Sequence, residues 1–183
     1  MKSHKPVNIA VCGSNAAGLP ATYFRQAFLI GQAIAKSGSV LFTGVTTGFS
    51  YEAVKGAFKA KGKIIGVSGA ESKAEHQERY EQVDLNLWDH IIYTGVGYKM
   101  RDVIMIRSVD AAIYIGGGVG TLVEMAAAPD QKVVMGILEG SGGATELIDF
   151  IQQISHRNKP VVVKSSDPET LVKKVTKRVK KKN

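Results

Sequence analysis

Short runs of β-branched and aliphatic residues alternate with longer helical stretches along the chain, and this alternation limits the possible folds more than any other feature. Alternating strands and helices are typical of a parallel sheet with right-handed crossovers. We therefore predict an α/β fold, a Rossmann-like doubly wound parallel sheet of about seven strands with helices on both faces. The predicted strands cover 7–11, 40–43, 63–68, 90–93, 111–115, 132–137 and 160–163. The predicted helices cover 20–36, 50–61, 99–109, 122–128, 144–156 and a last segment that begins at Asp167 or Pro168.

The length of 183 residues is most simply explained by one domain. We predict a single Rossmann-like nucleotide-binding domain over residues 1–170, followed by a basic helix end and tail over 171–183. Residues 69–87 are polar and form a long connection with room for a short helix. The only cysteine, Cys12, ends the first predicted strand, so we expect a buried thiol and a cytoplasmic setting. No apolar run is long enough for a membrane span, and no signal peptide is recognisable.

The net charge of +8 comes almost entirely from the C-terminal segment. Residues 171–183 carry seven lysine or arginine side chains and no acid, which leaves a net charge of +1 for the remaining chain. Three explanations stay open: a solvated helix end, a nucleic-acid attachment and a membrane-surface contact. The segment has no interleaved aromatic residues, so the sequence favours the solvated helix end, disfavours nucleic acid as a partner and predicts no membrane partner.

Glycine-bearing turns follow several of the predicted strands. In a parallel sheet these turns all lie at the carboxyl edge, where open α/β sheets bind their ligands. The sequence lacks the Gly-x-Gly-x-x-Gly spacing, an acid after the second strand and a Gly-x-x-x-x-Gly-Lys-Ser/Thr loop, so NAD and P-loop chemistry are disfavoured. The ligand-binding candidates in the first four turns are Gly13, Ser14, Asn15, Gly44, Thr46, Thr47, Gly95 and Gly97.

The glycine-rich turn over 116–120 is the strongest candidate for a phosphate site. It lies between the apolar strand 111–115 and the predicted helix 122–128. The first N–H groups of a helix lack partners, and the helix dipole attracts anions to them. We therefore assign phosphate binding to Gly117, Gly118, Gly120 and Thr121. Glu124 stands one turn further on, where a carboxylate would repel phosphate, and this position indicates a separate role.

Residues 117–124, Gly-Gly-Val-Gly-Thr-Leu-Val-Glu, resemble the Pro-Gly-Gly-x-Gly-Thr-x-x-Glu motif of the lonely-guy family. These proteins are cytokinin riboside 5′-monophosphate phosphoribohydrolases, long misnamed lysine decarboxylases. Arg101 lies fifteen residues before Gly116, where that family has its catalytic arginine. The resemblance implies that Arg101 and Glu124 are catalytic and cleave the N-glycosidic bond of a nucleoside 5′-monophosphate. In such a reaction a carboxylate stabilises the positive charge that develops on the ribose.

Two departures from that motif weaken the prediction of hydrolysis. Gly116 replaces the proline, and Asp102 replaces a lysine after the arginine, which weakens the attraction for an anionic substrate. The stretch 94–102 looks more like a sister branch that includes molybdenum-cofactor carriers and relatives of DNA-processing protein A. Three functions therefore stay open: a phosphoribohydrolase, a non-catalytic nucleotide or molybdenum-cofactor carrier, and a nucleic-acid factor. The Arg101–Glu124 pair has a purely structural alternative, an ion pair between two helix starts.

The sequence shows no metal site and implies no resident cofactor. The four histidines are scattered and lack the spacing of metal ligands, so we expect structural or surface roles for them. The apolar segment 100–109 is unusual for a surface helix. Together with the next helix it favours a homodimer or higher homo-oligomer, which the lonely-guy resemblance also implies.

Overall fold

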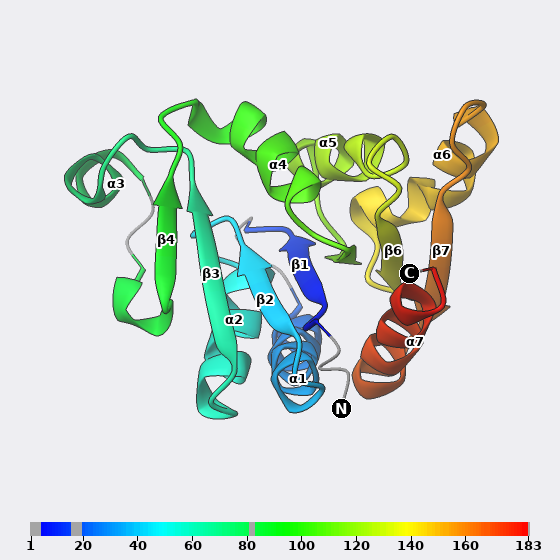
Figure 1. The fold of residues 1–183 in the computed structure, drawn as a ribbon, viewed down its shortest axis with the longest axis horizontal. Coiled ribbons are helices and arrows are strands. Elements are labelled where there is room, and N and C mark those ends of the chain that lie inside the picture. The colour runs from blue at the N-terminus through cyan, green and yellow to red at the C-terminus, as the bar shows by residue number, and fades with distance from the viewer. Residues whose placement is uncertain (1–4, 16–19, 81–82, 183) are drawn as a thin grey trace.

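A computed structural model describes residues 5–15, 20–80 and 83–182 of the chain. Figure 1 shows a single parallel sheet with helices packed on it. The strands are β1 (Asn8–Gly13), β2 (Val40–Thr43), β3 (Lys63–Ser68), β4 (His90–Tyr93), β5 (Ala111–Ile115), β6 (Val134–Leu138) and β7 (Val161–Ser165). The α-helices are α1 (Ala21–Lys36), α2 (Phe49–Lys59), α3 (Lys73–Arg79), α4 (Gly97–Arg107), α5 (Val119–Ala127), α6 (Ile148–Ile154) and α7 (Pro168–Lys180). Two short 3-10 helices, η1 (Leu85–Leu87) and η2 (Gly143–Leu147), complete the described elements.

The strand order β4-β3-β2-β1-β5-β6-β7 has one reversal of direction. The chain runs outward from β1 to β4, returns across the sheet in α4, and continues outward from β5 to β7. All neighbouring strands are parallel, and β1 pairs with β5 from Ile9↔Ala111 to Gly13↔Ile115. The predicted doubly wound sheet of seven strands is therefore confirmed. Its switch point, where such folds bind ligands, lies between β1 and β5.

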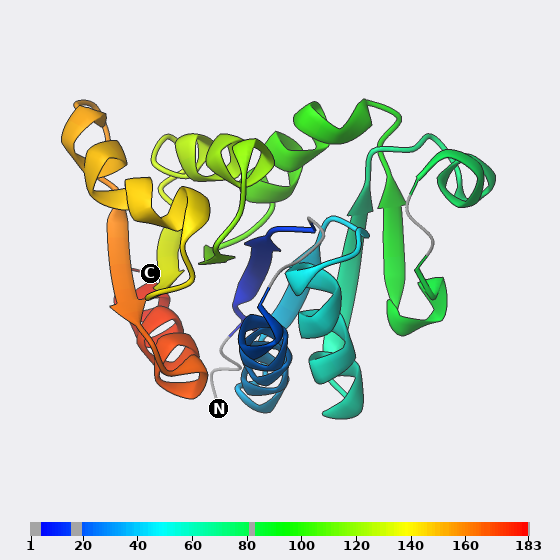
Figure 2. The ribbon, with the colours of Figure 1, turned by 180° about the vertical axis from the view of Figure 1, so that it is seen from behind.

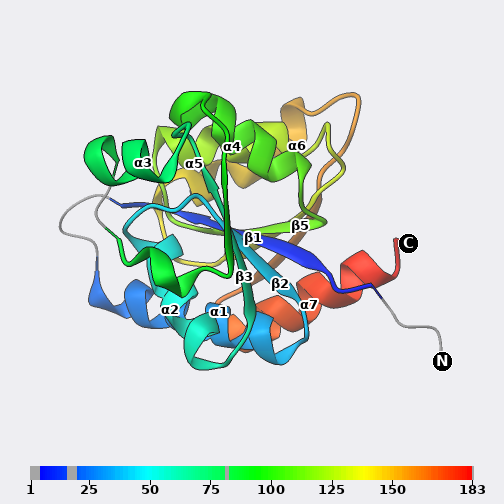
Figure 3. The same ribbon diagram turned by 60° about the vertical axis from the view of Figure 1, so that its left-hand side comes forward.

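Helices cover both faces of the sheet, as predicted. Figure 3 shows α1, α2 and α7 on one side and α4, α5 and α6 on the other, and Figure 2 shows α1 and α2 in front of the strands. The strand β5 divides its side chains between two apolar cores. Ile113 and Ile115 pack in the core with α1, α2 and α7, whereas Ala112 and Tyr114 pack in the core with α4, α5 and α6. This alternation follows from the two-residue period of a strand.

Several helix boundaries differ from the prediction by a few residues, and two of these differences concern the glycine-rich turn over 116–120. The helix α5 begins at Val119 rather than at 122, because Gly118 is its N-cap and the Gly118 carbonyl already accepts from Leu122 N. The predicted helix 144–156 is divided into η2 and α6. Ala144 N donates to the carbonyl of Gly117, and this bond fixes the start of η2 to the glycine-rich turn. Glycines therefore form the start of α5, although glycine is a poor helix former.

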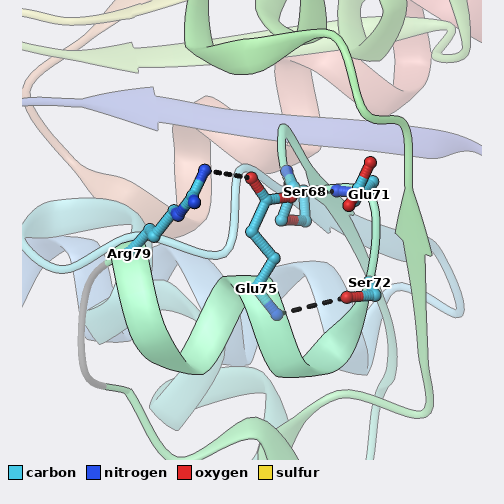
Figure 4. A network of polar contacts seen from close by, with 6 residues as sticks. Ser68, Glu71, Ser72, Glu75 and Arg79 are labelled. Carbon is cyan, nitrogen blue, oxygen red and sulfur yellow. Dashed lines mark hydrogen bonds and ion pairs between the residues drawn. The ribbon is translucent and has the colours of Figure 1, made fainter.

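The connection over 69–87 contains the short helix that the sequence left room for. Figure 4 shows how polar side chains hold the start of α3. Ser72 Oγ accepts from Glu75 N at 3.1 Å, and the Glu75 carboxylate accepts from Glu71 N at 2.7 Å. Glu75 also forms an ion pair with Arg79. This arrangement is close to a capping box, which satisfies the free N–H groups of a helix start.

None of the described helices combines the length and the apolar character that a membrane span requires.

Candidate functional site

A cavity of about 510 Å³ opens at the carboxyl ends of β1 and β5, at the switch point of the sheet. Turns that are far apart in the sequence contribute to it. Among the predicted site residues, those that line the cavity are Gly13, Ser14, Asn15, Gly44, Thr46, Arg101, Gly118, Gly120, Thr121 and Glu124. The convergence follows from the parallel sheet, which brings the ends of its strands to one edge.

Four predicted site residues do not line this cavity: Thr47, Gly95, Gly97 and Gly117. The three glycines among them have structural roles. Gly95 and Gly97 take positive φ angles of 67° and 72° and donate to the backbone of the β3–α3 turn. Gly117 takes a φ of 99°, and a Cβ there would lie 2.2 Å from Thr121 Oγ1. Gly117 is therefore needed for the shape of the turn.

The N-terminus of α5 is open to the cavity. Its N-cap is Gly118, which has no side chain to cap the helix, and Gly118, Val119 and Gly120 line the cavity. Ser141 Oγ accepts from Gly116 N at 2.8 Å, and this bond holds the glycine-rich turn that precedes α5. Uncapped N–H groups at a helix start carry a partial positive charge. This end of α5 is suited to an anion.

Arg101 brings a buried positive charge to the same cavity. The residue is only 4% exposed. Its guanidinium lies against the backbone of Gly44, where a Cβ would come within 1.5 Å of Nη1. Its Nε lies 3.5 Å from Asp102 Oδ1 but makes no hydrogen bond within the described part of the chain. Lys99 also lines the cavity, with Nζ 3.6 Å from the point that a Cβ on Gly120 would occupy.

Glu124 lies at the floor of the cavity and is buried. Burial, with a further contribution from the negative charge of Asp102, raises the pKa of Glu124 from 4.5 to about 8. Arg101, a hydrogen bond with Cys12, and Lys99 oppose this shift. The carboxyl group is therefore mostly protonated at neutral pH, and the repulsion of phosphate expected from a carboxylate is relieved. Among the described ion pairs, Arg101 pairs with Asp102 rather than with Glu124.

Cys12 lies beside Glu124 beneath the cavity. The residue is buried, as the sequence predicted, and burial followed by the charge of Glu124 raises the pKa of the thiol. Burial also raises the pKa of Asp102, although Arg101 and Lys99 lower it. The acidic groups of this site thus lie in surroundings that favour their neutral forms.

Tyr98 is the most informative cavity residue that the sequence analysis missed. The side chain is exposed, and its ring lies 4.8 Å from the ring of Tyr80 and 5.8 Å from the guanidinium carbon of Arg101. The sequence spacing indicates Tyr98 as a site residue, because residues three apart on a helix share a face and Tyr98 precedes Arg101 by three. The other cavity residues that were not among the predicted site residues are Val11, Cys12, Ser50, Lys99, Asp102 and Val119.

The described residues contain no group of three or more histidine, cysteine, aspartate or glutamate side chains that could hold a metal ion.

Comparisons with known proteins found one matching family model and several similar proteins. A model of the SLOG cluster4 family matches residues 6–172. A stretch of 105 residues is 32% identical to an uncharacterized protein of Archaeoglobus fulgidus, and it spans 57% of this chain but only 63% of that relative. The match therefore covers less than two thirds of the relative's length.

Two solved structures are similar over nearly their whole length. The molybdenum cofactor binding protein of Rippkaea orientalis has a TM-score of 0.77 and 27% identity, with 97% of this chain and 99% of that chain covered. The molybdenum cofactor carrier protein of Chlamydomonas reinhardtii has a TM-score of 0.75 and 28% identity, with 94% and 98% covered. These similarities agree with the sister branch that residues 94–102 suggested.

Proposed function

This chain belongs to the SLOG cluster4 family, and we propose that it binds a small phosphorylated ligand, a nucleotide or a pterin phosphate such as the molybdenum cofactor, without cleaving it. One observation carries the proposal: the uncapped start of α5 and two cationic side chains, Lys99 and Arg101, line the same cavity. Backbone N–H groups would hold the phosphate. The cations would add charge-assisted hydrogen bonds, each contributing roughly 1.5–3 kcal/mol before the cost of association. Micromolar to millimolar affinity follows.

The protonation of Glu124 supports binding over hydrolysis. With a pKa of about 8, its carboxyl group is largely neutral at pH 7 and cannot stabilise a positive charge on a ribose. A neutral carboxyl group beside a phosphate also costs less than a charged one. Asp102 takes the ion-pair contact with Arg101, which further separates this site from the arrangement that the lonely-guy resemblance implies.

The two similar molybdenum cofactor proteins favour a pterin phosphate among the possible ligands. A pterin and a nucleobase are both planar heteroaromatic rings, and Tyr98 offers a ring at the mouth of the cavity. A ligand with its phosphate at α5 could stack on this ring. The molybdenum cofactor would then be the cargo of the protein.

Hydrolysis of a nucleoside 5′-monophosphate is the second candidate function. It is favoured by the presence of both Arg101 and Glu124 in the cavity lining. If this reaction used Glu124 as a carboxylate, its rate would rise with pH toward the pKa of about 8.

Calorimetric titration tests binding. The probes are AMP, GMP, their nucleosides, and molybdenum cofactor released anaerobically from a molybdoenzyme. We expect the phosphorylated ligands to bind and the nucleosides to bind at least tenfold more weakly. Gly118→Asp and Gly118→Asn form a matched pair, since a Cβ at Gly118 meets no atom within 4 Å and both residues cap helices. Only the aspartate adds a negative charge, so it should weaken binding about tenfold more than asparagine does.

The same samples distinguish the two functions. Free base released by the wild-type protein and lost in Glu124→Gln would replace the binding proposal with the hydrolase. Equal effects of the two Gly118 variants, or equal binding of nucleotides and nucleosides, would contradict a phosphate site at α5.

A homodimer and a cytoplasmic location belong to this proposal. Several apolar side chains near the cavity are exposed, among them Val96, Met100 and Val119 on α4 and α5 or at their starts. A second copy of the chain could bury these side chains. Light scattering after size exclusion would measure the mass in solution, and a monomer would contradict this part.

A further inference from the structure

Four cationic residues meet at the edge of the sheet opposite the ligand cavity. Lys132 lies in the turn before β6, Arg157 and Lys159 lie in the connection before β7, and Lys182 follows α7. Together they line a separate cavity of about 280 Å³, and we call them the basic cluster. The Nζ group of Lys182 donates to the carbonyl of Lys132, which joins the end of the chain to this turn.

The sequence assigned the basic character to the C-terminal segment alone. In the structure, α7 runs back along β6 and β7, so that its last turn meets the two loops at the amino ends of these strands. Figure 3 shows the end of α7 on the same side of the molecule as the start of β1. All four cluster residues lie outside α7, and three of them come from the loops before β6 and β7. Stabilisation of the C-terminal dipole of α7 by nearby cations therefore does not account for them.

No aspartate or glutamate lines the cavity of the basic cluster. The nearest acid in sequence is Asp130, whose carboxylate accepts a hydrogen bond from Asn158 at 3.4 Å. At the opposite edge, beyond β6, a cavity is lined by Glu139, Glu146 and Asp149 with a single lysine. The cavity of the basic cluster is thus lined by cations alone among the charged residues, whereas the cavity beyond β6 is lined mainly by acids.

We propose that the basic cluster is a second binding site, which holds the phosphate backbone of duplex nucleic acid without reading its sequence. Clustered lysine and arginine side chains bind nucleic acid by neutralising phosphates. No aromatic residue lines this cavity, whereas proteins that bind single strands usually stack bases on aromatic rings. The duplex backbone is therefore the better match.

The packing of α7 argues against a membrane surface. A helix that lies in a membrane interface inserts its apolar face among the lipids. The apolar residues of α7, Leu171, Val175 and Val179 among them, are buried against the sheet. Only the charged face of α7 is exposed, and it lies next to the basic cluster.

Fluorescence anisotropy with a labelled DNA duplex tests the site. The variant Arg157→Gln with Lys159→Gln removes two exposed charges. Its control, Arg25→Gln with Lys73→Gln, removes two exposed charges near the carboxyl ends of the strands and has the same net charge. We expect the cluster variant to bind the duplex about tenfold more weakly. The slope of log affinity against log salt should fall by about two between about 50 and 200 mM. The control should change affinity by less than about twofold.

Three results would overturn the proposal: no binding of duplex by the wild-type chain at low salt, equal losses in the two variants, or tighter binding of anionic phospholipid vesicles or single strands than of duplex. Both variants replace exposed side chains, and a thermal melt of each checks that the fold is kept. Gly118→Asp should leave duplex binding unchanged, so the second site is tested independently of the ligand cavity.

Discussion

The guanidinium of Arg101 lies directly on the backbone of Gly44, fifty-seven residues earlier in the chain, so closely that a Cβ on Gly44 would stand 1.5 Å from Nη1. This contact joins the turn after β2 to α4 and positions the buried cation at the cavity. Glycine is therefore needed at position 44 for the close packing of Arg101, and not for a positive φ angle.

Gly44→Ala should therefore displace Arg101. We expect overpacking to cost about 1–3 kcal/mol of unfolding free energy and to weaken binding of phosphorylated ligands at least tenfold. A double-mutant cycle with Arg101→Ala isolates the contact, measured by denaturant unfolding and calorimetry. The cost of Gly44→Ala should shrink by about 1 kcal/mol or more when Arg101 is absent. An equal cost in both backgrounds would show that the alanine acts elsewhere.

The raised pKa of Glu124 predicts a pH-dependent stability. Between the ordinary pKa of 4.5 and the folded value of about 8, the unfolded chain releases the Glu124 proton and the folded protein keeps it. The free energy of unfolding should then decrease with rising pH in this window, by up to ~1.4 kcal/mol per pH unit. Glu124→Gln should flatten the dependence and stabilise the protein at pH 8. Urea unfolding from pH 5 to pH 8 measures this, with the exposed Glu146→Gln as control. An unchanged slope in Glu124→Gln would contradict the assignment.

Asp102→Asn should lower the pKa of Glu124, because the charge of Asp102 contributes to raising it. Removal of this carboxylate should also strengthen binding of an anionic ligand about fivefold, which corresponds to roughly 1 kcal/mol. Carbon-detected NMR of labelled glutamate side chains follows the Glu124 titration, and calorimetry follows the affinity. Weaker anion binding in Asp102→Asn would indicate that Asp102 is needed to hold Arg101 in place.

Tyr98 should contribute to binding through its ring. Tyr98→Leu should weaken a nucleotide or pterin phosphate about tenfold, as loss of stacking on an aromatic side chain does. Binding of inorganic phosphate should not change, and Tyr98→Phe should keep most of the affinity. Calorimetry with the wild-type protein, the two variants and both ligands makes the comparison. A loss of phosphate binding in Tyr98→Leu would show that Tyr98 acts by positioning Arg101.

Most of the fold could be predicted from local patterns. The strand 111–115 was placed correctly because a continuous apolar run is typical of a strand buried on both faces. The start of α5 was placed three residues late. Glycine is a poor helix former, and the bond from Ala144 to Gly117 that supports the turn comes from a distant segment.

The sequence by itself determined the parallel α/β architecture and the edge of the sheet where its glycine-bearing turns converge, because both follow from short-range periodicity and from the handedness of crossovers. Only the tertiary structure decided which side chains share that edge. Packing between segments far apart in the chain places Arg101 against Gly44 and buries Glu124, which raises its pKa. The same kind of packing brings Lys182 to two distant loops. No local pattern encodes such contacts, since burial and electrostatic environment arise only when the whole sheet has formed.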